Sequence, residues 1–185
     1  MADMLRKPVN DIHFNQRYTM KHTAHTHKTN AERILAQQQI AFEAFEYDVD
    51  HENLHVGIGV RVADVLGLNP DCCFKTLVLH NTHGDCFVCC IPSSCELDLK
   101  KVSAAAHEKS LSMLPPAQLE QACGYVRGGC SPIGMKKAYP VFIDESCMLF
   151  SEMYISGGRR GLTLKLAPQG LIDATSAQVI DIIHV

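Results

Sequence analysis

Two glycine-rich segments in the second half of the chain restrict what it can fold into and what it can bind. The first runs from residue 124 to residue 137 (GYVRGGCSPIGMKK), and the second is SGGRRG at residues 156 to 161. Glycine lets backbone N–H groups come close to a ligand, and the cations in each segment would neutralise an anion. Both segments are therefore candidate sites for a phosphate or a carboxylate, with tight turns between strands as the alternative interpretation.

A lysine and a threonine interrupt an apolar segment earlier in the chain. Residues 74 to 79 read FKTLVL, which is typical of a buried strand apart from Lys75 and Thr76. A lysine in such a place is unfavourable unless its charge meets a partner, so we expect Lys75 to serve a ligand or an ion pair. The G-x-x-x-x-G-K-[ST] motif and a G-x-G-x-x-G motif after a strand are both absent, so neither a P-loop nor a Rossmann site is expected.

Periodicity and turn signals predict one α+β domain. The capping-box spacing of Thr29 and Glu32 predicts a helix over residues 30–38, and a hairpin is expected around residues 81–85 between strands at 75–80 and 86–91. Other helices are expected at 60–66 (ending at Gly67), 97–106 and 117–122, and other strands at 40–47, 141–143, 153–155, 162–166 and 178–183. Residues 1–28 are polar without apolar periodicity, which predicts a flexible N-terminal extension followed by a domain over residues 29–185.

The order of these motifs resembles that of the YbaK/EbsC family. The matching stretches are Thr29 to Tyr47, Leu66 to Leu68, Phe74 to Thr76, residues 97–101 (LDLKK) and the two glycine-rich segments, and together they extend over residues 29–185. Members of this family are free-standing aminoacyl-tRNA deacylases, similar to the editing domain inserted in bacterial prolyl-tRNA synthetases. Residues 97–101 and 124–137 are most similar to the branch that hydrolyses Cys-tRNA(Pro).

The resemblance implies a fold and a set of site residues. The fold would be a mixed, β-barrel-like sheet flanked by helices, with the pocket at one mouth. Lys75, Thr76 and Gly128 would be catalytic, with the backbone N–H groups at Gly128 directed at the ester carbonyl. The substrate-binding residues would be Tyr47, Gly124, Gly129, Ser156, Gly157 and Arg160. No cofactor and no metal ion is implied.

The resemblance also implies a reaction. The substrate would be the aminoacyl ester of mischarged Cys-tRNA(Pro), and its own thiol would attack the carbonyl, form a thiolactone and expel the tRNA. No Ser-His-Asp order suggests an enzyme nucleophile instead. The expected partner is the CCA end of an aminoacyl-tRNA, with prolyl-tRNA synthetase as a second candidate.

One departure from the family pattern keeps two other functions open. Thr163 stands where family members commonly carry an acidic residue. The preference for cysteinyl over alanyl substrates therefore stays open, and one alternative is a deacylase for Ala-tRNA(Pro) or another misacylated tRNA, with water as the nucleophile. The other alternative is a non-catalytic module that binds aminoacyl-adenosine or a nucleotide.

The nine cysteines lie largely in apolar surroundings, and we interpret them as reduced thiols that pack like small hydrophobic side chains. Cys86 and Cys89 have the C-x-x-C spacing of zinc and redox sites. They lie in an apolar segment with strand propensity and lack a second pair of ligands, so a structural role is expected. Cys130 lies within the first glycine-rich segment, where an accessible thiol near the site is the alternative to a structural one.

Charge and hydropathy restrict location and partners. No apolar run is long enough to span a membrane, and the first 28 residues lack the apolar region of a secretory signal, so a cytoplasmic location is expected. The formal net charge of −3 argues against an extended basic surface for a whole tRNA. A positive rim suited to the CCA phosphates could instead be formed by Lys100, Lys101, Lys109, Arg127, Lys136, Lys137, Arg159 and Arg160, with a solvated surface as the alternative for each.

Overall fold

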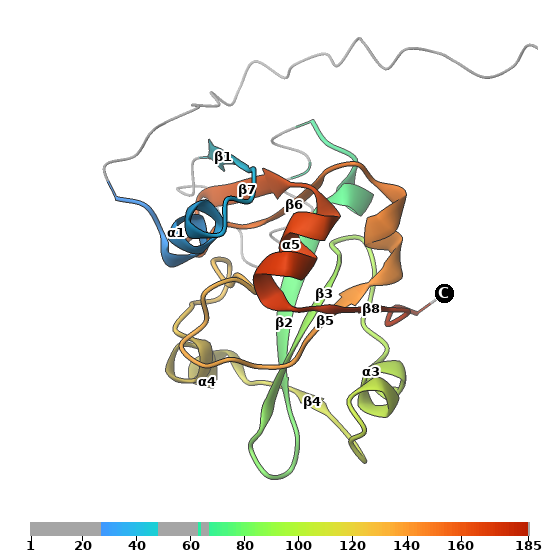
Figure 1. Ribbon diagram of the computed structural model, residues 1–185. Helices are drawn as coiled ribbons and strands as arrows, with labels where there is room; N and C mark the ends of the chain where they lie inside the picture. The colour runs from blue at the N-terminus through green and yellow to red at the C-terminus, as the bar shows by residue number, and fades with distance from the viewer. Residues whose placement is uncertain (1–26, 48–62, 64–66, 185) are drawn as a thin grey trace, which may run out of the picture.

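The computed structural model describes residues 27–47, 63 and 67–184, and these form a mixed α+β fold with two sheets (Figure 1). One sheet has three antiparallel strands in the order β1 (Glu43–Glu46), β7 (Leu162–Leu166) and β6 (Met153–Ser156). The other has five strands in the order β4 (Ser112–Met113), β2 (Phe74–His80), β3 (Cys86–Pro92), β5 (Val141–Asp144) and β8 (Gln178–Ile180).

The mixed α+β fold flanked by helices is confirmed, but the described strands do not close into a barrel. Cys73, just before β2, forms a parallel bridge with Tyr154 in β6, and this bridge connects the two sheets. An isolated bridge allows the two strands to diverge on either side of it, whereas a continuous ladder would hold them together. Space for side chains is therefore left between the sheets.

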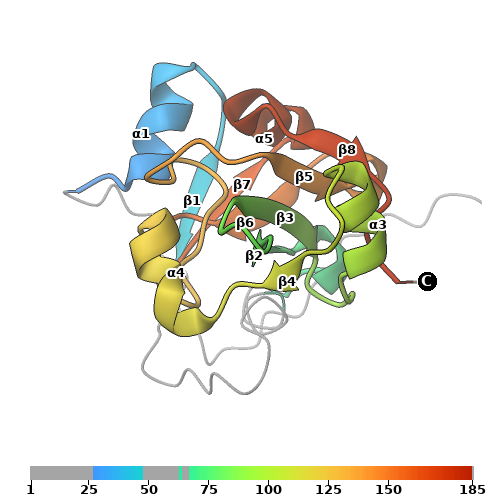
Figure 2. The same ribbon diagram turned by 90° about the horizontal axis from the view of Figure 1, so that it is seen from below.

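Both faces of the five-stranded sheet are covered. The predicted hairpin is formed by β2 and β3, which pair from Phe74↔Pro92 to His80↔Cys86, one residue longer in each strand than expected, and every residue of β3 is buried. One face packs against the three-stranded sheet and against α1 (Asn30–Gln37) and α5 (Pro168–Thr175), and the other packs against α3 (Leu99–Ala105). Seen from below, α3 and α4 (Pro116–Cys123) lie on opposite sides of the hairpin (Figure 2).

Local signals set the helix ends. The predicted capping box is formed, because the Glu32 N–H donates to Thr29 Oγ1 at 3.2 Å and the Thr29 N–H donates to Glu32 Oε2 at 2.7 Å. Asp98 caps α3 through the backbone N–H groups of Lys100 and Lys101. Two short 3₁₀ helices, Pro70–Cys72 and Glu145–Leu149, precede β2 and β6.

None of the described helices has the length and hydrophobicity that a membrane span requires.

The predicted elements are largely present. The strands expected at 40–47 and 178–183 are shorter than predicted, and α5 was not predicted at all. The helix expected at 60–66 lies outside the described residues except for Ala63, which is helical, and so do residues 1–26 of the expected extension.

All nine cysteines are free thiols, and all except Cys95 are buried. Cys86 and Cys89 are three residues apart in a strand, so their side chains point to opposite faces of the sheet. They pack in different hydrophobic clusters and cannot share one metal ion. Among the described residues, no three His, Cys, Asp or Glu side chains gather where they could bind one.

Candidate active site

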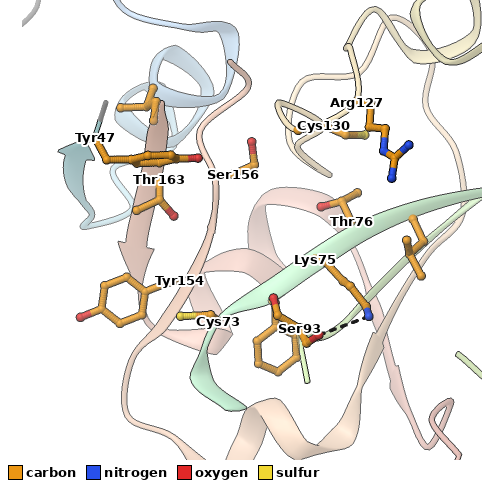
Figure 3. Close-up of a pocket in the computed structure, with 14 residues that line it drawn as sticks. Tyr47, Cys73, Lys75, Thr76, Ser93, Arg127, Cys130, Tyr154, Ser156 and Thr163 are labelled. Carbon is orange, nitrogen blue, oxygen red and sulfur yellow. Dashed lines mark hydrogen bonds between the residues drawn. The ribbon is translucent and has the colours of Figure 1, made fainter. Parts of the chain in front are cut away.

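A cavity of about 230 Å³ lies between the two sheets, beside the bridge that connects them (Figure 3). Its walls come from the start of β2, from β6 and β7, and from the first glycine-rich loop. The lining residues are Tyr47, Cys73, Phe74, Lys75, Thr76, Leu77, Ser93, Arg127, Gly128, Cys130, Tyr154, Ser156, Leu162 and Thr163. Segments that are far apart in the sequence thus meet at one place.

Five residues that the sequence singled out for the site line this cavity: Lys75, Thr76, Gly128, Tyr47 and Ser156. Gly128 has a φ of +88°, a backbone conformation that glycine adopts without strain and other residues do not. The four other predicted site residues do not line the cavity: Gly124, Gly129, Gly157 and Arg160.

The residues outside the cavity hold the two glycine-rich loops together. A Cβ atom on Gly129 would lie 2.9 Å from the backbone of Arg159 and Arg160, which leaves no room for a side chain. Arg160 Nε donates to the Arg127 carbonyl at 2.9 Å. Gly157 packs equally tightly on a leucine side chain of β7. Packing against the second loop accounts for Gly129, and packing against β7 accounts for Gly157, in both cases without a ligand.

Gly124 has a different structural role. It terminates α4 in the left-handed conformation with a φ of +84°, where its N–H donates to the Glu120 carbonyl. The chain can then turn from the helix into the loop that carries Gly128.

The expected basic rim is largely wrong for this cavity. Arg127 is exposed and lines it, while Arg159 forms an ion pair with Glu46 beside it. Lys101 lies in α3, on the face of the five-stranded sheet that is turned away from the cavity. There the Lys101 ammonium binds Asp181 and the Ile183 carbonyl. The lysines that do not line the cavity are Lys100, Lys101, Lys109, Lys136 and Lys137.

The Lys75 ammonium binds backbone carbonyls. Its Nζ donates to the Cys95 carbonyl at 2.6 Å and to the Ser93 carbonyl at 3.3 Å, both in the turn after β3. Because an ammonium group has three N–H donors, a third one remains for a ligand. The partner that a half-buried lysine requires is thus supplied by the main chain.

Two hydroxyl groups of the cavity lack normal hydrogen bonds. Among the described residues, three buried side-chain oxygens have no partner: Thr76 Oγ1, Ser93 Oγ and Ser146 Oγ. Thr76 has the thiol of Cys90 beside it on β3, and a thiol is only a weak hydrogen-bonding group. A buried hydroxyl without a partner is unfavourable, so its presence in a cavity indicates a place for a polar group of a ligand.

The cavity thiols are protonated at neutral pH. Contact with the neighbouring Cys72 thiol, together with burial, raises the pKa of Cys73. Contact with Cys123 and burial likewise raise the pKa of Cys130, and the same contact lowers the pKa of Cys123 to about 7. Cys123 does not line the cavity, and neither does any described histidine. The described lining therefore contains no evident enzyme nucleophile.

Thr163, which the sequence singled out, and Ser93, which it did not, both line the cavity. Thr163 lines the cavity, and its hydroxyl donates to the Ile155 carbonyl at 3.0 Å across to β6. Ser93 was not predicted as a site residue. The predicted hairpin contained a signal for it, because the pairing of Lys75 with Ile91 places Ser93 beside Cys73.

Two comparisons identify the family. A family model of the aminoacyl-tRNA editing domain matches residues 59–174. The protein EbsC of Enterococcus faecalis (strain ATCC 700802 / V583), provisionally named a Cys-tRNA(Pro)/Cys-tRNA(Cys) deacylase, is 37% identical over 155 residues, which are 84% of this chain and 93% of that protein.

Solved structures have the same fold. A provisionally assigned trans-editing enzyme for prolyl-tRNA synthetase has 22% identity and a TM-score of 0.67, with 78% of this chain and 87% of that chain covered. The hypothetical protein APE2540 has 19% identity and a TM-score of 0.74, with 84% and 100% covered. As the resemblance to YbaK/EbsC predicted, the chain belongs to the aminoacyl-tRNA editing domain family.

Proposed function

We propose that this protein deacylates mischarged tRNA and that Cys-tRNA(Pro) is its favoured substrate. The observation that carries the proposal is the cavity between the sheets, which is lined by Gly128, by Lys75 and by two residues with unpartnered hydroxyls. Its volume of about 230 Å³ suits a small aminoacyl group rather than a whole nucleotide. The relative named a Cys-tRNA(Pro)/Cys-tRNA(Cys) deacylase supports the choice of substrate.

Each lining residue then has a role that its position supports. The Gly128 N–H would stabilise the oxyanion that forms when the ester carbonyl is attacked. Lys75 would direct its remaining N–H at the reacting ester, and Thr76 would hydrogen-bond the substrate. Tyr47 and Ser156, on the wall formed by the three-stranded sheet, would border the terminal ribose. Exposed Arg127 would lie beside the CCA phosphates.

The nucleophile in this proposal is the thiol of the substrate. Its thiolate attacks the ester carbonyl carbon, a C–S bond forms, the bond to the ribose oxygen breaks, and the 3′-hydroxyl of the tRNA leaves with a proton. The protonated state of Cys73 and Cys130 supports this assignment, since thiols react chiefly as thiolates. We further propose that the enzyme acts in the cytoplasm beside prolyl-tRNA synthetase, which the trans-editing neighbour suggests.

Deacylation assays on purified Cys-tRNA(Pro), Ala-tRNA(Pro) and Pro-tRNA(Pro) test this function. We expect rapid release from Cys-tRNA(Pro), a thiolactone product that mass spectrometry can trap, and no effect on Pro-tRNA(Pro). Rapid hydrolysis of Ala-tRNA(Pro) alone would replace the assigned substrate. Binding of aminoacyl-adenosine without turnover of any substrate would make the protein a non-catalytic module.

A further inference from the structure

The buried end of the cavity is formed by residues to which the proposed reaction assigns no role. Ser93, Cys73 and Phe74 are 8%, 2% and 4% exposed, whereas Arg127 is exposed. Figure 3 shows Ser93 and Cys73 on the side of the cavity away from Arg127. Since a tRNA must approach from solvent, the buried end faces the part of the substrate farthest from the tRNA, which is the amino-acid side chain.

Ser93 is held firmly in this position. Its N–H donates to the Cys73 carbonyl at 2.7 Å, and its own carbonyl accepts from Lys75 Nζ at 3.3 Å. The residue is thus attached both to β2 and to the residue just before it, while Ser93 Oγ has no partner among the described residues. A fixed hydroxyl in a buried position is suited to recognise one polar atom of a ligand.

One charged group, the Lys75 ammonium, lies beside this hydroxyl, and backbone carbonyls solvate it. The Lys75 ammonium binds the carbonyls of Ser93 and Cys95, and the Cys73 thiol stays protonated. Phe74 completes an apolar boundary. Such a place disfavours a second positive charge and accepts a small neutral group that can form one hydrogen bond.

We propose that the Ser93 hydroxyl hydrogen-bonds the side-chain thiol or hydroxyl of the aminoacyl group and selects cysteinyl and seryl esters over alanyl esters. The inference rests on the proposed function and deepens it. An alanyl group would leave Ser93 Oγ buried and unpaired, and sites that hydrogen-bond a substrate reject an analogue lacking that group. Seryl esters bind as well as cysteinyl esters in this scheme, but they react slowly because a hydroxyl is the weaker nucleophile.

Binding of non-hydrolysable analogues tests the inference separately from catalysis. The probes are adenosine 3′-amides of cysteine, serine and alanine, measured by calorimetry with the wild-type protein, with Ser93→Ala and with Ser146→Ala. Ser146 is the matched control, because its hydroxyl is also buried and unpartnered but does not line the cavity. Melting temperatures of both variants should equal or exceed that of the wild type, since each removes an unsatisfied group.

We expect the wild-type protein and Ser146→Ala to bind the cysteinyl and seryl amides about tenfold more tightly than the alanyl amide, the effect of one neutral hydrogen bond. Ser93→Ala should bind all three equally. A preference that survives in Ser93→Ala, no preference in the wild type, or equal weakening of all three amides in Ser93→Ala would overturn the inference. Since turnover is not measured, failure of the proposed deacylation would be visible separately, in the tRNA assays.

Discussion

Two of the cavity's walls are built differently. The strand wall, residues 73–77 with Ser93, presents side chains from β2 and from the turn after β3, and the ladder between β2 and β3 fixes their positions. The loop wall, residues 127–130, presents the Gly128 backbone between the side chains of Arg127 and Cys130, and packing of Gly129 against the second glycine-rich loop fixes it. A substitution in the strand wall should therefore remove chemistry and leave the fold intact, whereas an added Cβ in the loop wall should affect both.

The largest effect is expected from Lys75→Ala. This change removes the only charged group of the strand wall among the described lining residues, and we expect kcat/KM for Cys-tRNA(Pro) to fall by about 10³, within the usual range for a group at the reacting atoms. Lys101→Ala is the matched control, because Lys101 also donates to a backbone carbonyl, that of Ile183, but lies on the far side of the sheet. Wild-type turnover by a well-folded Lys75→Ala protein would remove Lys75 from the mechanism.

Gly128→Ala should lower both activity and stability. Displacing one oxyanion donor costs about 10² to 10³ in rate, and a non-glycine residue with a φ of +88° costs about 1 to 2 kcal/mol of folding free energy. Gly84→Ala provides the control, since Gly84 has a φ of +87° in the β2–β3 turn with open space around it. Chemical denaturation should show the same destabilisation for both variants, with loss of activity only for Gly128→Ala. Full activity of Gly128→Ala would make the loop wall purely structural.

Thr76→Val, in the strand wall, should lower activity without lowering stability, in contrast to Gly128→Ala. The valine keeps the shape of the threonine but removes a buried hydroxyl without a normal hydrogen bond, so the melting temperature should stay the same or rise. We expect kcat/KM to fall by about tenfold, the value of one hydrogen bond to substrate. An unchanged rate would show that the Thr76 hydroxyl does not contact the substrate.

The smallest effect is expected from Cys130→Ser. The pKa of the Cys130 thiol is raised by contact with Cys123 and by burial, so this thiol is protonated and inert near neutral pH. Its loss should leave turnover of Cys-tRNA(Pro) within about threefold of wild type, since a substrate thiol supplies the nucleophile.

The pH profile distinguishes the two thiols. Only the deprotonated substrate thiol attacks, so the rate in both proteins should rise with pH toward a pKa of about 8.5 and level off above it. A pH-independent rate in the wild type, together with loss of activity in Cys130→Ser, would indicate an enzyme nucleophile instead.

The strand wall could be predicted from the sequence more completely than the loop wall. Lys75 and Thr76 are visible as polar residues in an apolar strand, and the hairpin register follows from the turn at residues 81–85. The same register places Ser93 beside Cys73, but the lack of a partner for its hydroxyl is visible only in three dimensions, and Ser93 was therefore missed.

In the loop wall, composition indicated several glycines without showing which of them faces a ligand. Gly129 contacts Arg159 and Arg160 across a long stretch of sequence, so only tertiary packing separates its role from that of Gly128. The division of the strands into two sheets has a similar origin, because the contact between Cys73 and Tyr154 is likewise non-local.

The most direct test of the account is a crystal structure with the adenosine 3′-amide of cysteine bound. We expect the amide carbonyl beside the Gly128 N–H, the thiol beside Ser93 Oγ and the adenosine toward Arg127. An analogue bound in the separate groove lined by Gln118 and Lys137, or one with its adenine between the two sheets, would contradict it.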